Sequence, residues 1–252
     1  MITQQLLDKL RNDEPVFGVC LKFAAPALLE VMGPGWDFIW IDLQHGYVTE
    51  DALKHLLCAC DLIGVSSLVR PPGQARQLIS RILDWDAGAV IVPQVHTAEE
   101  AADVVRAAKF PPVGDRSYGG PRVLFRNGRD YNERANERQL VVAQIESPQA
   151  VENAEAIAAV EGVDVLMLAP DDLRLRIGVP RTGSLAGKEI LEAADVVGAA
   201  AAKHGKACMA IATETEHVRL FMDRGFRLFL VGSDSGFVLE GMESTRAMID
   251  GL

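Results

Sequence analysis

Two acidic residues in the second half of the chain have the surroundings expected of metal ligands. Glu146 lies near the end of an apolar run at 140–147, and Gln144 precedes it by two residues, so both side chains face the same side of a strand. An unpaired glutamate is costly to bury inside a protein. Asp172 follows the next apolar run, and two carboxylates with water form an all-oxygen site suited to Mg²⁺, Mn²⁺ or Co²⁺. The structural alternative is an ion pair between Glu146 and Arg70, with Asp172 capping a helix.

A second set of residues has the chemistry to move protons and to stabilise negative charge. His45 follows Asp42 by three residues, and Asp42 and Asp84 are carboxylates able to orient its imidazole. Arg70 lies at the end of another apolar run, and its guanidinium offers a fixed fork of donors to a carboxylate or an enolate oxygen. A structural histidine and an arginine that closes the mouth of the fold are the simpler interpretations.

A repeating alternation of strands and helices must position these residues. Short apolar runs, typical of parallel strands buried on both faces, occur at 16–23, 38–43, 67–71, 89–95, 140–147, 163–170, 206–212 and 227–234. Helix-like segments between them lie at 25–32, 49–63, 74–84, 97–109, 148–158, 187–204, 214–224 and 236–249. Eight such alternations in 252 residues predict an α/β fold of the (β/α)₈ TIM-barrel type, whose active site lies at the carboxyl ends of the strands.

Composition and motifs exclude several other classes of protein. A doubly wound nucleotide-binding sheet is disfavoured, because no GxGxxG turn or P-loop follows the first run. No segment has the composition of a linker, so we expect residues 1–252 to form a single domain. The formal net charge of −10 argues against nucleic-acid and membrane partners. With no apolar run near the ~18 residues of a membrane span and no signal-peptide core at the start, a cytoplasmic location is expected.

Two connections are longer than a barrel needs, at 110–139 and 171–186. The first contains six arginines and the second contains three. Long loops at defined places in a compact fold usually have a function.

Short motifs occur in order along nearly the whole chain. They are Asp42-x-x-His45, Val69-Arg70-Pro71, Leu83-Asp84, Val92-Pro93, Phe110-Pro111-Pro112-x-Gly114-x-Arg116, Gln144-x-Glu146 and Pro170-x-Asp172-Leu173. Together they resemble the HpcH/HpaI family of class II pyruvate aldolases, whose best-known member cleaves 4-hydroxy-2-oxoheptanedioate. The resemblance implies a (β/α)₈ barrel, a divalent metal held by Glu146 and Asp172, and a hexamer built as a trimer of dimers that exchange their last helix.

The resemblance also implies how the chemistry is divided. The substrates would be a 2-oxo acid (pyruvate or hydroxypyruvate) and an aldehyde, joined or released as a 4-hydroxy-2-oxo acid. Gln144 and the backbone amides near Asp171 and Asp172 would position the 2-oxo acid beside the metal. Arg70 would join the metal in stabilising the enolate, so Arg70→Ala is expected to lower the rate by roughly 10²–10³-fold while folding stays nearly intact.

Proton transfer and substrate contacts are implied for four more positions. His45, supported by Asp42 and Asp84, would belong to the relay that serves the oxygen derived from the aldehyde. Gly120 stands where a serine hydroxyl commonly helps to hold the substrate carboxylate, and Asp171 replaces a small residue beside the metal ligand. Because of these departures from the family pattern, the sequence supports the type of reaction better than it supports the identity of the substrate.

Three other functions fit parts of the pattern. A Schiff-base aldolase would need a lysine at the carboxyl end of a strand, where Lys22 lies. A CoA-thioester lyase of the citrate lyase type would use the same metal pair and a basic surface, for which the arginines of 110–139 are candidates. A barrel that binds a small molecule without catalysis is the third alternative.

The last predicted helix carries more apolar surface than one barrel edge should need. Its apolar residues include Phe237, Val238, Met242, Met248 and Ile249. We therefore expect it to pack against another subunit, in agreement with the oligomer that the resemblance implies.

Overall fold

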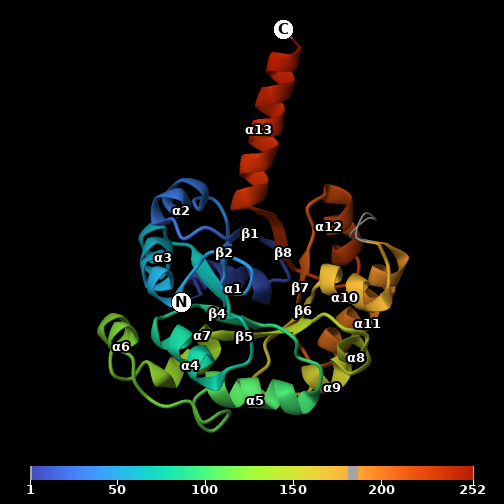
Figure 1. The fold of residues 1–252 in the computed structure, drawn as a ribbon. Coiled ribbons are helices and arrows are strands. Elements are labelled where there is room, and N and C mark those ends of the chain that lie inside the picture. Colours follow the sequence, from blue (N-terminus) through green and yellow to red (C-terminus); the bar gives the residue numbers. More distant parts are fainter. Residues whose placement is uncertain (1, 181–186, 252) are drawn as a thin grey trace.

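Eight parallel strands close into a barrel in the order in which they occur along the chain (Figure 1). They are β1 (Val16–Leu21), β2 (Phe38–Asp42), β3 (Ser66–Arg70), β4 (Ala89–Val92), β5 (Leu140–Ile145), β6 (Val165–Leu168), β7 (Ala207–Ile211) and β8 (Leu228–Ser233). β1 pairs with both β2 and β8, which closes the sheet. The predicted barrel is confirmed over residues 2–180 and 187–251, which the computed structural model describes.

Alternation along the strands divides the core into two layers. Side chains such as Trp40 and Val142 pack together inside the barrel, whereas Ile39 belongs to the layer between strands and helices. Side-chain direction repeats every two residues along a strand. Asp42 and Gln144 therefore continue the inward rows at the carboxyl ends of their strands, which puts polar groups above an apolar barrel interior.

Helices surround the strands, as predicted (Figure 1). They are α2 (Pro26–Met32), α3 (Glu50–Ile63), α4 (Arg76–Asp84), α5 (Ala98–Ala108), α8 (Pro148–Glu152), α9 (Ala154–Ala158), α11 (Lys188–Lys203), α12 (Thr215–Met222) and α13 (Asp234–Asp250). Side-chain oxygens of Thr49, Thr97 and Ser147 cap three of them. The helix predicted at 148–158 is two helices, because the chain bends at Asn153, whose side-chain amide donates to the carbonyl of His96 at 2.8 Å.

Four short helices were not anticipated by the strand–helix alternation. They are α1 (Gln4–Arg11), α6 (Pro121–Asn127), α7 (Asn132–Arg138) and α10 (Pro170–Ile177). α1 buries Leu6 and Leu7 with the side chains inside the barrel. α6 and α7 fold the long connection at 110–139, and α10 begins the one at 171–186, of which residues 181–186 lie outside the described part of the chain.

α13 leaves the barrel after β8 and projects away from it (Figure 1). Only Asp234, in its first turn, is buried. In the part of the chain that the structure describes, no helix has the length and apolar character needed to cross a membrane.

Candidate active site

A cavity of about 630 Å³ lies where the carboxyl ends of the strands meet. Barrel enzymes hold their substrates at this end. The cavity is lined by six of the residues predicted from the sequence, namely Asp42, His45, Arg70, Gln144, Asp171 and Asp172. A seventh, Glu146, contacts the lining residue Gln144 through a hydrogen bond.

Glu146 is buried just after β5, with 2% of its surface exposed. Its Oε1 accepts a hydrogen bond from the backbone N–H of Gln94 at 2.8 Å, and its Oε2 accepts one from the side-chain amide of Gln144. Burial raises the pKa of Glu146, and the negative charge of Asp172 raises it further. A cation between the two carboxylates would relieve both effects.

Asp172 lies in the first turn of α10, behind Pro170. The partial positive charge at a helix N-terminus favours a carboxylate there. Backbone N–H groups in the first turn of a helix form a site that favours an anion, and this end of α10 faces the cavity that Asp171 and Asp172 line. α10 thus brings the carboxylate of Asp172 and its own N-terminal N–H groups to the cavity.

The residues present fit a divalent cation. Among the described residues, Oε1 of Gln144 is buried and has no hydrogen-bond partner. With the carboxylates of Glu146 and Asp172, it makes an all-oxygen donor set of the kind that hard cations prefer. No group of three or more His, Cys, Asp or Glu side chains converges within the described residues. Oxygen atoms of substrate or water would therefore have to complete the coordination.

Arg70 forms a bidentate ion pair with Asp42, from Nε to Oδ1 at 2.9 Å and from Nη2 to Oδ2 at 2.6 Å. The two residues are direct partners in the parallel register of β2 and β3. The guanidinium also lies over the ring of Trp40, 4.8 Å from its centroid. Burial alone would raise the pKa of Asp42, but the donors and charge of Arg70 and two backbone N–H groups together lower it. Asp42 is therefore held ionised.

This ion pair corrects the expectation that Arg70→Ala would leave folding nearly intact. Asp42 is fully buried, so the loss of Arg70 would leave a buried charge without its partner. Breaking such a pair from one side costs about 3–5 kcal/mol. A guanidinium carries five N–H donors, and Asp42 takes two of them, so Arg70 keeps donors for the cavity that it lines.

His45 lies exposed at the mouth of the cavity. Asp42 Oδ1 accepts hydrogen bonds from the backbone N–H groups of Gln44 and His45, at 3.0 Å and 3.2 Å. Asp42 therefore holds the turn that carries His45, and no hydrogen bond joins its carboxylate to the imidazole among the described contacts. The contact that Asp42 makes with His45 is therefore to the backbone of His45 and not to its imidazole.

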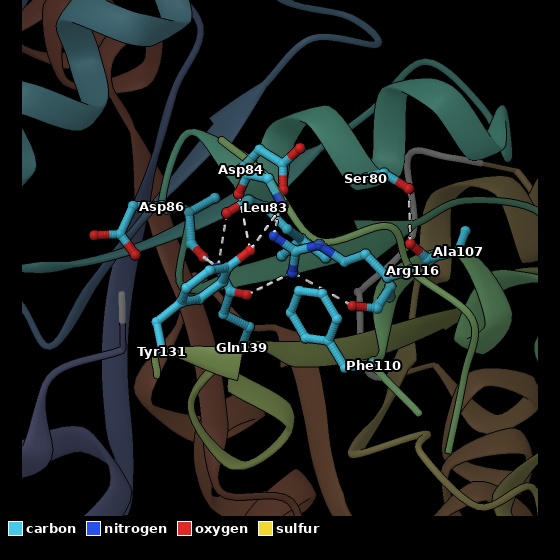
Figure 2. Close-up of polar contacts among 12 residues, drawn as sticks. Ser80, Leu83, Asp84, Asp86, Ala107, Phe110, Arg116, Tyr131 and Gln139 are labelled. Atoms are coloured by element: carbon cyan, nitrogen blue, oxygen red, sulfur yellow. Dashed lines mark hydrogen bonds and ion pairs between the residues drawn. The ribbon is translucent and has the colours of Figure 1, made fainter. Parts of the chain in front are cut away.

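Asp84 and Gly120 lie together away from this cavity, at the end of the barrel where α4 leads into β4. Asp84 accepts a hydrogen bond from the buried Arg116 at 2.7 Å, and Arg116 also binds Gln139 at 2.6 Å and lies over the ring of Phe110 (Figure 2). Gly120 has a φ of +91°, and a Cβ there would lie 2.8 Å from that of Asp84. Glycine is required at this position for close packing. Within one chain, neither Asp84 nor Gly120 lines the cavity.

The chain matches the HpcH/HpaI aldolase/citrate lyase family over residues 17–240. It belongs to this family. It is 36% identical over 231 residues to a hydroxypyruvate/pyruvate aldolase of Delftia acidovorans, covering 89% of this chain and 84% of that protein. It is 34% identical over 229 residues to a 4-hydroxy-2-oxovalerate aldolase of Novosphingobium aromaticivorans, covering 90% and 87%. The crystal structure of an HpcH/HpaI aldolase from Desulfitobacterium hafniense superposes with a TM-score of 0.91 at 28% identity, covering 100% of this chain and 98% of that one. This family member is a carbon–carbon lyase.

Ion pairs within the chain involve most arginines of 110–139 in this member of the HpcH/HpaI family, which makes a CoA-binding surface there less favourable. Arg116 is buried against Asp84, Arg122 pairs with Asp61, and Arg126 pairs with Asp61 at 2.8 Å and with Asp86 at 3.0 Å. Arg134 also pairs with Asp130 at 3.9 Å, so carboxylates of the same chain already pair with four of the six arginines that the citrate-lyase-type alternative would use.

Several residues at the site were not found from the sequence, among them Cys20 and Gln94. Cys20 lines the cavity, and burial raises the pKa of its thiol to about 12, so it contributes a neutral apolar surface. Gln94 contacts Glu146 through its backbone N–H. The type of a residue does not predict a contact made by its backbone, and the sequence around Cys20 indicates only an ordinary core thiol.

Proposed function

We propose that this HpcH/HpaI family member makes and cleaves the carbon–carbon bond between the enolate of pyruvate or hydroxypyruvate and an aldehyde, giving 4-hydroxy-2-oxo acids. The observation that carries the proposal is the cluster of oxygen donors from buried Glu146 and Gln144 and half-buried Asp172, beside a cavity of about 630 Å³. The named relatives, a hydroxypyruvate/pyruvate aldolase and a 4-hydroxy-2-oxovalerate aldolase, support this substrate class.

Glu146 and Asp172 would hold the cation, with Mg²⁺, Mn²⁺ or Co²⁺ as the candidates. A bound divalent cation supplies positive charge that stabilises an enolate without a Schiff base. Gln144 lines the cavity and donates a hydrogen bond to Glu146, and it would fix one face of the 2-oxo acid. The backbone N–H groups at the start of α10 would donate hydrogen bonds to its carboxylate.

Arg70 would stabilise the negative charge that develops as the bond to the aldehyde carbon breaks. Its guanidinium is held by Asp42 and by the ring of Trp40, so it is oriented before substrate binds. Donors fixed in advance stabilise developing charge more effectively than donors that must reorient. His45, at the exposed mouth, would handle the proton of the aldehyde-derived oxygen.

Asp84 and Gly120 are excluded from the cavity of their own chain by their position at the other end of the barrel. In the hexamer that we propose, built as a trimer of dimers, they can serve only the cavity of a neighbouring copy. Their predicted roles, support of His45 and contact with the substrate carboxylate, therefore depend on assembly.

Retro-aldol and aldol assays test the proposed reaction. With Mn²⁺ or Mg²⁺ added, we expect the protein to join pyruvate or hydroxypyruvate to members of an aldehyde panel, with the product identified by mass spectrometry. It should also exchange the methyl protons of pyruvate with deuterated solvent in the absence of aldehyde, because enolate formation needs only the 2-oxo acid. Absence of both reactions with every pair of substrates would contradict the proposal.

The Schiff-base alternative gives a separate prediction. Lys22 lines the cavity, so a lysine is present where such an enzyme would need one. Because the proposed mechanism stabilises the enolate with a cation and Arg70, we expect no covalent adduct when the protein is treated with pyruvate and borohydride. Intact-mass measurement would detect the adduct, and the variant Lys22→Met serves as the negative control. An adduct that disappears in this variant would establish the Schiff-base mechanism.

Helix α13 gives the prediction for assembly. Its large apolar side chains Phe237, Val238, Leu239, Met242, Met248 and Ile249 are all exposed in the single chain. A contiguous apolar face of this kind marks a contact with another protein chain, and we propose exchange of α13 between subunits. Light scattering at micromolar concentration should therefore show an oligomer. Met242→Asp should weaken it, whereas Ala247→Asp, at an exposed position on the opposite side of the same helix, should not. A monomeric native protein would contradict the proposal.

A further inference from the structure

Gln94 has a backbone conformation that glutamine rarely adopts. Its φ is +58°, and it follows Pro93 in the loop after β4. The left-handed region is costly for residues that carry a Cβ, and it persists where the surroundings impose it. Among the described residues, Asp13 and Asp86 are the other non-glycine residues with positive φ, and of these three Gln94 is the one that contacts Glu146. Contacts near the active site must therefore impose the positive φ of Gln94.

The backbone of Gln94 is held from both sides. Its N–H donates to Oε1 of Glu146 at 2.8 Å. Its carbonyl accepts a hydrogen bond from Nε2 of Gln74 at 2.7 Å, and the carbonyl of Pro93 accepts one from the same nitrogen at 3.3 Å. Gln74 lies in the neighbouring loop, between β3 and α4. The side chain of Gln94 is itself exposed, so its backbone makes the contact with the site.

We propose that Gln74 and Gln94 are positioning residues for the metal ligand Glu146. Gln74 holds the Gln94 peptide in the left-handed conformation, and this conformation directs the N–H onto one carboxylate oxygen. Gln144 holds the other oxygen. The carboxylate is thereby fixed in orientation relative to Asp172 before a cation binds. The inference rests on the metal site of the proposed function.

The physical basis is the same as for other outer contacts to metal ligands. A ligand that must be oriented on binding loses affinity, and the loss of a hydrogen bond to a ligand typically weakens metal binding 10- to 100-fold. With a negative φ at position 94, the N–H would turn away from Glu146. The buried carboxylate would then lose a donor and rotate.

Mn²⁺ binding to the full chain, followed by the electron paramagnetic resonance signal of free Mn²⁺, tests this directly and needs no turnover. Gln74→Glu keeps the shape of the side chain and removes its donor, so we expect Mn²⁺ to bind about 10-fold more weakly. Gln94→Val places a β-branched residue in the left-handed region and should weaken binding at least as much. Gln94→Gly accepts positive φ without strain and should keep most of the affinity.

Gln77→Ala, an exposed glutamine on α4 near Gln74, is the matched control and should bind Mn²⁺ as the native protein does. Native affinity in both Gln74→Glu and Gln94→Val would overturn the inference, as would equal losses in Gln94→Gly and Gln94→Val. If Gln94→Val does not fold, Gln74→Glu decides the result. A native protein that binds no Mn²⁺ would overturn the metal site itself, which separates failure of the proposed function from failure of this inference.

Discussion

Chelation of divalent cations will abolish aldol turnover, and Mg²⁺, Mn²⁺ or Co²⁺ will restore it. The loss should exceed roughly a thousandfold, because a Lewis acid contributes several kcal/mol to the stabilisation of an enolate and each 1.4 kcal/mol is a factor of ten. The negative charges of Glu146 and Asp172 oppose one another, so a cation between them would stabilise both carboxylates. The measurement is the rate of aldol cleavage before and after treatment with EDTA and readdition of each metal.

Substitution of a ligand should reproduce this loss. Glu146→Gln keeps the side-chain shape and removes the charge, so both Mn²⁺ binding and activity should fall together. Glu152→Gln, an exposed glutamate on α8, is the matched control and should leave both unchanged. Full activity in a metal-free preparation would exclude the metal-dependent mechanism.

Arg70→Ala will lower both the rate and the stability of the protein. We expect the exchange of pyruvate methyl protons to slow by roughly 10²–10³-fold, the loss typical of one donor to a developing oxyanion. We also expect the free energy of unfolding to fall by about 3–5 kcal/mol, because Asp42 keeps a buried charge without its partner. Deuterium exchange followed by NMR measures the first effect, and denaturant unfolding measures the second.

Two further variants separate catalysis from folding. Arg70→Lys keeps a positive charge beside Asp42 but loses the fork, so it should recover more of the stability than of the rate. The double variant Arg70→Met with Asp42→Asn removes both charges and should be more stable than Arg70→Ala while remaining slow. Native exchange of pyruvate protons in a folded Arg70→Ala protein would show that Arg70 acts on the aldehyde side or only in the structure.

Much of the fold followed from local patterns. Apolar runs of strand length alternate along the chain with segments of helical period. Backbone geometry allows few arrangements in which such elements can be connected. Boundaries shifted by a few residues, as between the run at 163–170 and β6 (Val165–Leu168), because hydrogen bonding to neighbouring strands decides where a strand ends. The helices α6 and α7 were missed because helices of seven residues are too short to show a clear apolar period.

The sequence by itself determined which chemical groups stand at the strand ends, since Gln144, Glu146 and Asp172 follow from residue type and a two-residue period. Only the tertiary structure decided which groups meet. The register of β2 against β3 pairs Arg70 with Asp42, and the packing of α4 against 110–139 takes Asp84 to Arg116. Such contacts join residues far apart in the chain, and backbone contacts such as that of Gln94 leave no mark on residue type. Their geometry exists only once the barrel has closed.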